Sequence, residues 1–207
     1  NDGQARFAEV GLSAGVALSE SARPEAGMGT DFGDFDRDGD LDIAVCNFQW
    51  EACRLYRNDG DDAFADMSFA SGLGEPTLAT LTFGTDFLDY DNDGDRDFLV
   101  MQRYFPQVIQ KAFSNTMPFT ADFLRNDSDD SVNWIQVELH GSPGNRDAIG
   151  STVTLITNQG REAQQVGQSD SSHYSQGHYR LYFSIGNETE PEMLEVTWPD
   201  GIVQQIH

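Results

Sequence analysis

The sequence has few basic residues and no long hydrophobic stretch. Its 207 residues include 35 acidic but only 12 basic ones, which gives a formal net charge of −23. Such an excess of negative charge repels nucleic acids and anionic membrane surfaces, so we expect neither DNA nor RNA as a partner. No apolar run approaches the roughly 18–20 residues needed to cross a bilayer, so we expect no membrane span.

Cysteine is also scarce, because only Cys46 and Cys53 occur. An apolar run at 41–45 precedes the pair and residues 54–56 follow it, so a hairpin would bring the two thiols together. We predict a disulfide, as found in oxidising compartments, with two buried free thiols as the alternative. Hydrophobic residues still form 38 % of the chain, which is enough for a packed core.

What the chain has in abundance is aspartate in an alternating pattern. A nine-residue segment has an aspartate at every second position and a glycine at its sixth position. The same pattern returns 55 residues later. The first loop contains Asp34, Asp36, Asp38, Asp40 and Asp42, and the second contains Asp89, Asp91, Asp93, Asp95 and Asp97.

This spacing predicts two calcium sites. Ca²⁺ prefers six to eight oxygen ligands at about 2.3–2.6 Å, which a short acidic loop with a glycine bend can supply. Positions one, three, five and nine of each loop would provide carboxylates, and position seven a backbone carbonyl. Carboxylates this close repel one another unless a cation lies among them. A solvated acidic turn is the alternative, and we expect the two ions to be structural because no general base is recognisable nearby.

The residues around the loops repeat as well, which predicts an all-β, propeller-like architecture. The segment 29–32, Gly-Thr-Asp-Phe, returns at 84–87, and such self-similarity is typical of repeat arrays. Short apolar runs between Asp, Gly and Asn turns predict one four-stranded blade and a second blade without its fourth strand. The expected strands are 28–34, 41–47, 54–58 and 63–69, then 82–88, 97–103 and 123–125.

An insertion at 104–122 interrupts the second blade, and we expect a loop there with one helical turn near 108–113. From residue 133 onward the acidic repeats stop, and apolar residues alternate with polar ones in four segments. This predicts a small β-sandwich or barrel. Asp, Ser and Asn cluster at 127–132 and mark a boundary. We therefore expect calcium-binding β repeats over 1–130 and a separate β domain over 131–207.

These motifs resemble FG-GAP/VCBS-type repeats followed by an ASPIC/UnbV domain, as in cartilage acidic protein and related secreted bacterial proteins. The resemblance covers nearly the whole chain, although the family usually has glycine where Ala148 stands. It implies an extracellular, calcium-dependent adhesion or structural protein and no established reaction, so we expect no enzyme. The residues that carry it are 29–42, 84–97 and 54–60 in the repeats, and 133–135, 145–150, 181–186 and 194–201 in the second domain.

The number of repeats does not close a propeller ring. Residues 5–10 match the last strand of a blade by analogy with 63–68, and an unpaired blade edge can accept such a strand from a neighbour. We therefore predict head-to-tail strand complementation into a homo-oligomer or fibre. The alternatives are that 5–10 folds back within its own chain, or that this chain is part of a longer propeller.

Other motifs add weaker expectations. Asn126 and Asn187 begin Asn-x-Ser/Thr sequons and are candidate glycosylation sites. The four histidines match no zinc motif, and no nucleophile stands out. Trp50 is a candidate for contact with a glycan or a partner. The leading hypothesis is a calcium-stabilised extracellular structural or adhesion protein; a monomeric glycan- or ligand-binding module and an accessory domain of a larger secreted protein are the alternatives.

Overall fold

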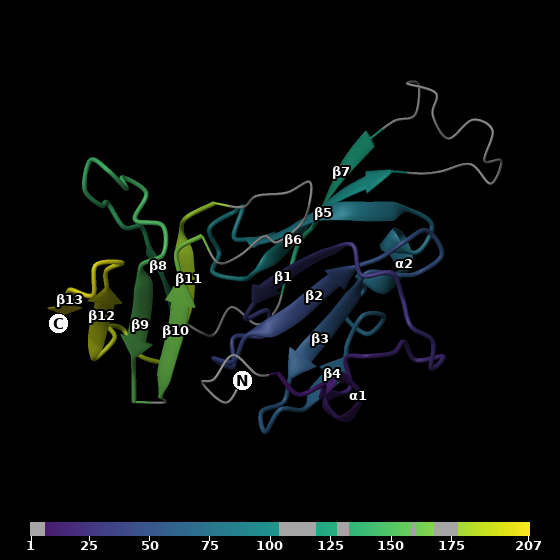
Figure 1. Cartoon of the computed structure of the whole chain (residues 1–207), viewed down its shortest axis with the longest axis horizontal. Coiled ribbons are helices and arrows are strands. Elements are labelled where there is room, and N and C mark those ends of the chain that lie inside the picture. Colours follow the sequence, from purple (N-terminus) through teal and green to yellow (C-terminus); the bar gives the residue numbers. More distant parts are fainter. Residues whose placement is uncertain (1–6, 104–118, 128–132, 159, 168–177) are drawn as a thin grey trace.

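The structure is a computed structural model that describes residues 7–103, 119–127, 133–158, 160–167 and 178–207 (Figure 1). Strands dominate these ranges and form several antiparallel sheets, with no closed barrel among them. The predicted all-β, propeller-like class is therefore confirmed. Within the same ranges, none of the helices has the length and apolar character that a membrane span requires.

The first blade is an antiparallel sheet with the strand order β1-β2-β3-β4. The first aspartate loop joins β1 to β2, and the register pairs Gly33 with Asp42 at the base of the loop. A short helix, α1 (Gly11–Ala14), precedes this blade, and α2 (Gly74–Thr77) follows it. The four strands lie close to the predicted ranges: β1 (Gly29–Gly33), β2 (Asp42–Cys46), β3 (Arg54–Asn58) and β4 (Phe64–Asp66).

The second blade has three described strands in the order β5-β6-β7. They are β5 (Leu81–Leu88), β6 (Asp97–Arg103) and β7 (Phe119–Leu124). The prediction that 104–122 is a loop is wrong at its end, because pairing with β6 extends β7 back to Phe119. The expected helical turn at 108–113 lies outside the described residues. Within the described residues, no fourth strand pairs with β7.

The two blades pack against each other through β1 and β5. Gly29 lies against the carbonyl of Phe83, and a Cβ at this position would overlap that oxygen. Asp31, which is buried, accepts a hydrogen bond from the backbone N–H of Phe87 at 2.7 Å. One apolar core serves both blades, and its buried members are Ala44, Cys46, Cys53, Leu55, Leu73, Phe87, Phe98 and Val100. The two loops are thus held on one common body.

The remaining strands form a four-stranded sheet, β10-β9-β12-β13, and a two-stranded sheet, β11-β8, around a second core. The four predicted segments correspond to β8, β9, β11 and β12, whereas β10 and β13 were not predicted. The sequence of β10, Arg-Glu-Ala-Gln-Gln, is almost entirely polar. In Figure 1 these strands lie beside the blades. Their bounds are β8 (Asn133–Val137), β9 (Thr152–Ile156), β10 (Arg161–Gln165), β11 (Leu181–Gly186), β12 (Met193–Thr197) and β13 (Val203–Ile206).

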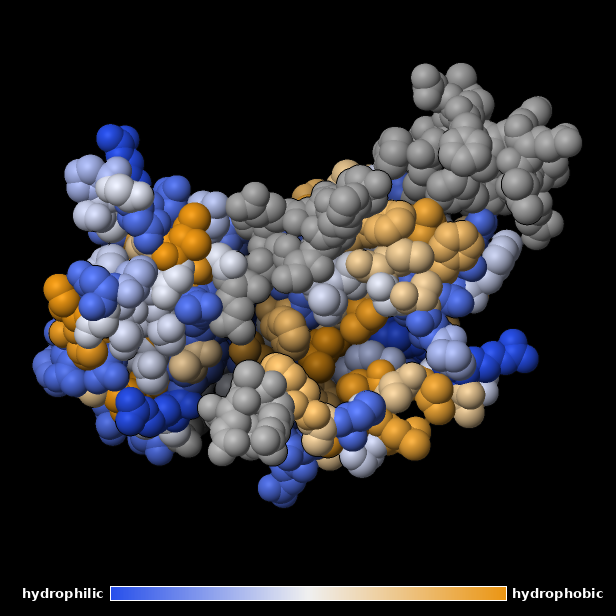
Figure 2. All heavy atoms as spheres, viewed as in Figure 1, coloured by the Kyte–Doolittle hydropathy of each residue, from blue (hydrophilic) through white to orange (hydrophobic). Residues whose placement is uncertain are grey.

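The predicted strand at 5–10 is described only from residue 7 onward, and residues 7–10 are not in a strand. Phe7 is 83 % exposed and Val10 is 55 % exposed. Figure 2 shows that other hydrophobic side chains also gather on the visible face of the blades. Large exposed apolar residues of the blades include Phe32, Phe48, Trp50, Phe69, Met101 and Phe123. The prediction that 5–10 pairs as a strand is thus not met within the described part of this single chain.

Candidate metal centres

Each aspartate loop brings three carboxylates together. In the first loop, oxygens of Asp34, Asp36 and Asp42 all lie within 4.8 Å of one another. In the second loop, Asp89, Asp91 and Asp97 do the same, and in both triads the middle residue is exposed while the outer two are buried. Each triad could hold a metal ion. The positions are one, three and nine of each loop, as the sequence predicted for carboxylate ligands.

Backbone hydrogen bonds hold the first carboxylate of each loop in place. The Asp34 carboxylate accepts from the N–H groups of Asp38 at 3.1 Å and Gly39 at 3.2 Å. Asp89 accepts from Asp93 and Gly94 at the same two distances. The glycine at the sixth position has a φ of +96° in the first loop and +94° in the second. This left-handed conformation suits glycine and turns the chain back over the carboxylate.

The ninth-position carboxylate ties each loop to the strands beside it. Asp42 accepts from the N–H groups of Phe35 and Asn58, each at 2.8 Å. Asp97 accepts from Tyr90 and Asn126, each at 3.0 Å. Asn58 ends β3 and Asn126 follows β7, so the third strand of each blade closes the loop between its first two strands. The repeated Asn-Asp step marks these two residues in the sequence, although its role as a loop clamp was not predicted.

The fifth and seventh positions are arranged differently from the triads. Asp38 accepts a hydrogen bond from the N–H of Asp40 at 2.9 Å, and Asp93 accepts one from Asp95 at 2.9 Å. Neither fifth-position side chain belongs to its triad. The side chain of Asp95 is fully buried and forms an ion pair with Arg37 of the first loop. The predicted role of position seven uses only its backbone carbonyl, so the side chain can make this contact.

Burial makes it costly to keep the carboxylates of the first site ionised. Burial raises the pKa of Asp34 to about 7, although the charge of Arg96 opposes the shift. Burial also raises the pKa of Asp42 to about 7, although the two N–H groups that donate to it oppose the shift. In the second loop burial raises the pKa of Asp97. Arginines reach the exposed edge of each triad, since Arg57 lies 4.0 Å from Asp36 and Arg125 lies 3.8 Å from Asp91.

A divalent cation would offset this cost of burying carboxylates. The donor set consists of oxygens alone, which suits a hard cation such as Ca²⁺ better than zinc or copper. The carboxylates are already oriented by backbone N–H groups, so little rearrangement would be needed to bind an ion. The residues present therefore fit two calcium ions, one held by each triad.

A scan against protein-family models matches residues 34–100 to the FG-GAP-like repeat and residues 141–207 to the ASPIC and UnbV family. The chain combines an FG-GAP-like repeat with an ASPIC and UnbV domain. The resemblance noted from the motifs is thereby confirmed. A search of the curated proteins finds no match.

The FG-GAP-like repeat matched at 34–100 includes both aspartate loops and both cysteines. Cys46 and Cys53 form a disulfide between the end of β2 and the start of β3. Both are buried in the core shared by the blades. The bridge therefore braces the first blade near its core, away from the loop at the other end of the β1-β2 hairpin.

The two sequons occupy different environments. The side-chain amide nitrogen of Asn126 donates to the carbonyl of Phe35 at 2.9 Å, so a glycan on this nitrogen would disturb that contact. Asn187 is exposed in a turn after β11 of the ASPIC and UnbV domain. Of the two predicted glycosylation sites, Asn187 is therefore the better placed, and its occupancy stays a prediction. Trp50 is 56 % exposed in the loop that the disulfide closes.

Proposed function

We propose that this protein is an extracellular, calcium-stabilised structural or adhesion protein that assembles with copies of itself. The observation that carries the proposal is the pair of matching carboxylate triads, oriented by the same hydrogen bonds in both loops. FG-GAP repeats often bind calcium, which supports Ca²⁺ as the ion. The disulfide supports an oxidising, extracellular location. The role is structural rather than catalytic, because each ion would join loop to strand rather than face a reaction site.

Calorimetric titration of the metal-depleted protein with calcium tests this proposal. We expect two ions per chain and a higher melting temperature with calcium than with chelator, because an ion that binds only the folded state stabilises it. Magnesium at the same concentration serves as the control, since Mg²⁺ demands stricter octahedral geometry and loses water reluctantly. Absence of calcium binding would contradict the proposal.

Assembly is supported by the match between the N-terminal segment and β4. In the first blade Phe64 follows Asn58-Asp59-Gly60 by four residues, and Phe7 follows Asn1-Asp2-Gly3 by the same interval. The first blade pairs Tyr56 with Asp66, Arg57 with Ala65 and Asn58 with Phe64. Transferred to the second blade, this register places Glu9 opposite Leu124, Ala8 opposite Arg125 and Phe7 opposite Asn126.

A second copy is the better donor of this strand. The backbone of Gly15, just after α1, lies against the carbonyl of Phe64 in β4, and Figure 1 shows α1 beside β4 with β7 on the other side of the blades. Residues 7–10 would have to cross both blades to reach β7 of their own chain. Donation between chains is heterologous, so it generates a fibre when the rotation does not close.

Light scattering of the full chain in calcium tests the assembly. We expect polymers that shorten with the variants Phe7→Asp and Val10→Asp, because a buried carboxylate would oppose docking of the strand. Leu12→Asp is the matched control, since Leu12 is 73 % exposed and lies in α1, outside the proposed strand. A monomer at all concentrations, or equal effects of all three substitutions, would contradict strand donation while leaving calcium binding intact.

Glycan binding is a second candidate function, favoured by one hollow on the ASPIC and UnbV domain. This hollow has a volume of about 420 Å³ and lies beside Trp198 and Pro199, with His140, Asn145 and Asp200 among its lining residues. An aromatic face flanked by polar groups suits a sugar ring. Binding to a glycan array that is lost in His140→Ala and Asp200→Ala would support this function.

A further inference from the structure

The two aspartate loops contact each other and the ASPIC and UnbV domain. Arg37 of the first loop forms a buried ion pair with Asp95 of the second, and the two side chains are 4 % and 0 % exposed. The carbonyl of the same Arg37 accepts a hydrogen bond from Ser184 of β11 at 3.5 Å. The loops therefore share one buried charged contact, and the second domain begins directly beside it.

The second loop makes the closer contact with that domain. The side-chain amide of Gln136, on β8, donates to Asp89 at 3.3 Å and to Asn92 at 3.4 Å. Arg180 donates to the oxygen of the same amide at 3.3 Å, which is consistent with the amide nitrogen facing the loop. Gln136 precedes the matched range 141–207, but its strand β8 pairs with β11 of the ASPIC and UnbV domain. It thus contacts the first carboxylate of the metal triad from the two-stranded sheet that β11 and β8 form.

Gly94 in the same loop lies directly under the ring of Trp134, so that a Cβ there would overlap the ring. Gly39 holds the matching position of the first loop, and a Cβ added to it would meet nothing within 4 Å among the described residues. Both glycines have left-handed backbone conformations. The two glycines differ in their surroundings, because only Gly94 contacts Trp134.

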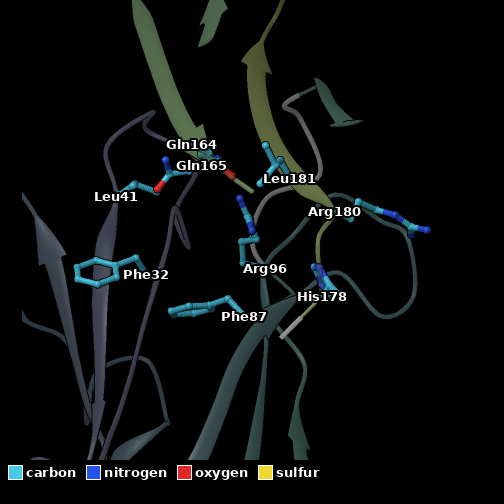
Figure 3. A pocket seen from close by; sticks show the side chains of 9 residues that line it. All are labelled: Phe32, Leu41, Phe87, Arg96, Gln164, Gln165, His178, Arg180 and Leu181. Carbon is cyan, nitrogen blue, oxygen red and sulfur yellow. The ribbon is translucent and has the colours of Figure 1, made fainter. Parts of the chain in front are cut away.

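Arg96, the residue after Asp95, links the second loop to Tyr182 of the second domain. Its guanidinium donates to the carbonyl of Tyr182 at 2.6 Å and lies 4.6 Å from the centre of the Tyr182 ring. In Figure 3 Arg96 projects between Phe87 of β5 and the residues Gln164 and Leu181 of the second domain. The cavity at this place has a volume of only about 40 Å³, so the two domains are closely packed here.

From these contacts we propose that the ASPIC and UnbV domain docks on the metal loops and that Gln136 is an outer positioning residue of the second metal site. This inference rests on the proposed calcium binding. An ion that fixes Asp89 also fixes the surface that Gln136 and Trp134 contact, and the docked domain in turn fixes the Asp89 carboxylate. Calcium affinity and domain docking are therefore coupled, and the coupling must be equal in both directions.

Calcium titration of the full chain measures the coupling at one site. The background substitution Asp36→Ala removes the exposed ligand of the first triad, so that only the second site binds. In this background we expect Gln136→Ala to weaken calcium binding by about tenfold, as is typical when a residue behind a metal ligand is removed. Gln204→Ala is the control, because Gln204 is an exposed glutamine on β13, far from both loops in sequence.

Substitutions at the two matching glycines test the contact between the second loop and Trp134. Gly94→Ala and Gly39→Ala impose a similar backbone cost, but only Gly94→Ala displaces Trp134. All chains in this experiment carry Phe7→Asp and Val10→Asp, which oppose the proposed assembly. We expect X-ray scattering in calcium to give a larger radius of gyration for Gly94→Ala than for Gly39→Ala, and chelation to increase the radius of the chain without a glycine substitution. Calcium binding that is unchanged by Gln136→Ala, or equal radii for the two glycine variants, would overturn the coupling. Absence of calcium binding in the unsubstituted protein would instead overturn the proposed function.

Discussion

The two blades carry the same aspartate loop in different surroundings. The first blade has four strands and a disulfide, whereas the second has three described strands. At the positions that match the two cysteines, the second blade pairs Met101 with Ala121. The hydrogen bonds inside the two loops nevertheless agree to within about 0.2 Å at every matching pair. The loop geometry is therefore set by its own nine residues and by the asparagine at the end of the third strand. The disulfide, which only the first blade has, is not required.

The loops also differ at their fourth position. Arg37 and Asn92 both have a φ of +61°, but Arg37 reaches Asp95 of the other loop while Asn92 contacts Gln136 of the second domain. Asparagine tolerates the left-handed region better than arginine. Arg37 therefore has a less favourable backbone conformation than Asn92, but its side chain forms a buried ion pair between the two loops.

The largest effect is expected from removing the ninth carboxylate. Asp42→Ala deletes a triad ligand and leaves two backbone N–H groups without their acceptor. We expect the loss of one calcium ion of two, and in excess calcium a decrease of about 4 kcal/mol in the free energy of unfolding, since an unsatisfied buried donor costs about 1–3 kcal/mol. Asp97→Ala should act equally on the second loop, whereas Asp147→Ala, at an exposed turn outside both loops, should change neither quantity. Unequal effects of the first two would show that the blades do not hold their loops alike.

The next largest effect is expected where the loops differ. Arg37→Asn gives the first loop the residue type of the second but leaves Asp95 buried without its arginine. We expect a loss of about 3 kcal/mol in the free energy of unfolding, because breaking one partner of a buried ion pair leaves an uncompensated charge. Urea denaturation measures this loss. Adding Asp95→Asn to the same chain should recover part of it, and no recovery would mean that Arg37 acts through other contacts.

Removing the disulfide makes the first blade more like the second. For the double variant Cys46→Ala and Cys53→Ala we expect a loss of about 2.5 kcal/mol from loop entropy alone. Calcium stoichiometry should stay at two, because the second loop keeps the same geometry without a bridge. Thermal unfolding and calorimetry provide the two measurements. Loss of an ion together with the bridge would show that the first loop depends on it.

Much of the repeat could be predicted from the sequence because its residues act locally. Aspartate spacing and the glycine at position six determine the loop, and apolar alternation marks most strands. The sequence does not predict β10, because an edge strand needs few apolar residues. It predicts β7 too short, because Thr120, Ala121 and Asp122 have no apolar pattern. Ala148, noted as a departure from the family's glycine, indeed has a left-handed φ of 53°.

The surroundings of the loops could not be predicted in the same way. The contacts of Arg37 with Asp95 and of Gln136 with Asp89 join residues that are 58 and 47 positions apart in the chain. No local pattern pairs such residues, because their approach depends on how the two blades and the second domain pack. The sequence therefore predicted the candidate ligands, and the structure identified the contacts between the two loops and the second domain.

The smallest effect expected is a dependence on pH. In the metal-free protein the pKa values of Asp34 and Asp42 are about 7, above the ordinary value of 3.8. Protonation of these two carboxyls therefore stabilises the folded metal-free state relative to the unfolded state. This contribution to the free energy of unfolding is full below pH 3.8 and is lost as the pH rises toward 7. Calcium requires ionised carboxylates, so its stabilising effect should grow over the same interval.

Calorimetry at about pH 6.5 and 7.5 checks this sign and compares the two loops. With the second site disabled by Asp91→Ala, we expect calcium to bind the first site about tenfold more weakly at the lower pH, because each of its two carboxyls with a pKa of about 7 weakens binding about threefold; the total is about 1.4 kcal/mol. With the first site disabled by Asp36→Ala, the same measurement gives the pH dependence of the second site. Because burial raises the pKa of both buried carboxyls of the first triad to about 7, we expect that site to lose its ion as the pH falls through this range. Equal affinity of the first site at both pH values would mean that its carboxyls stay ionised without the metal.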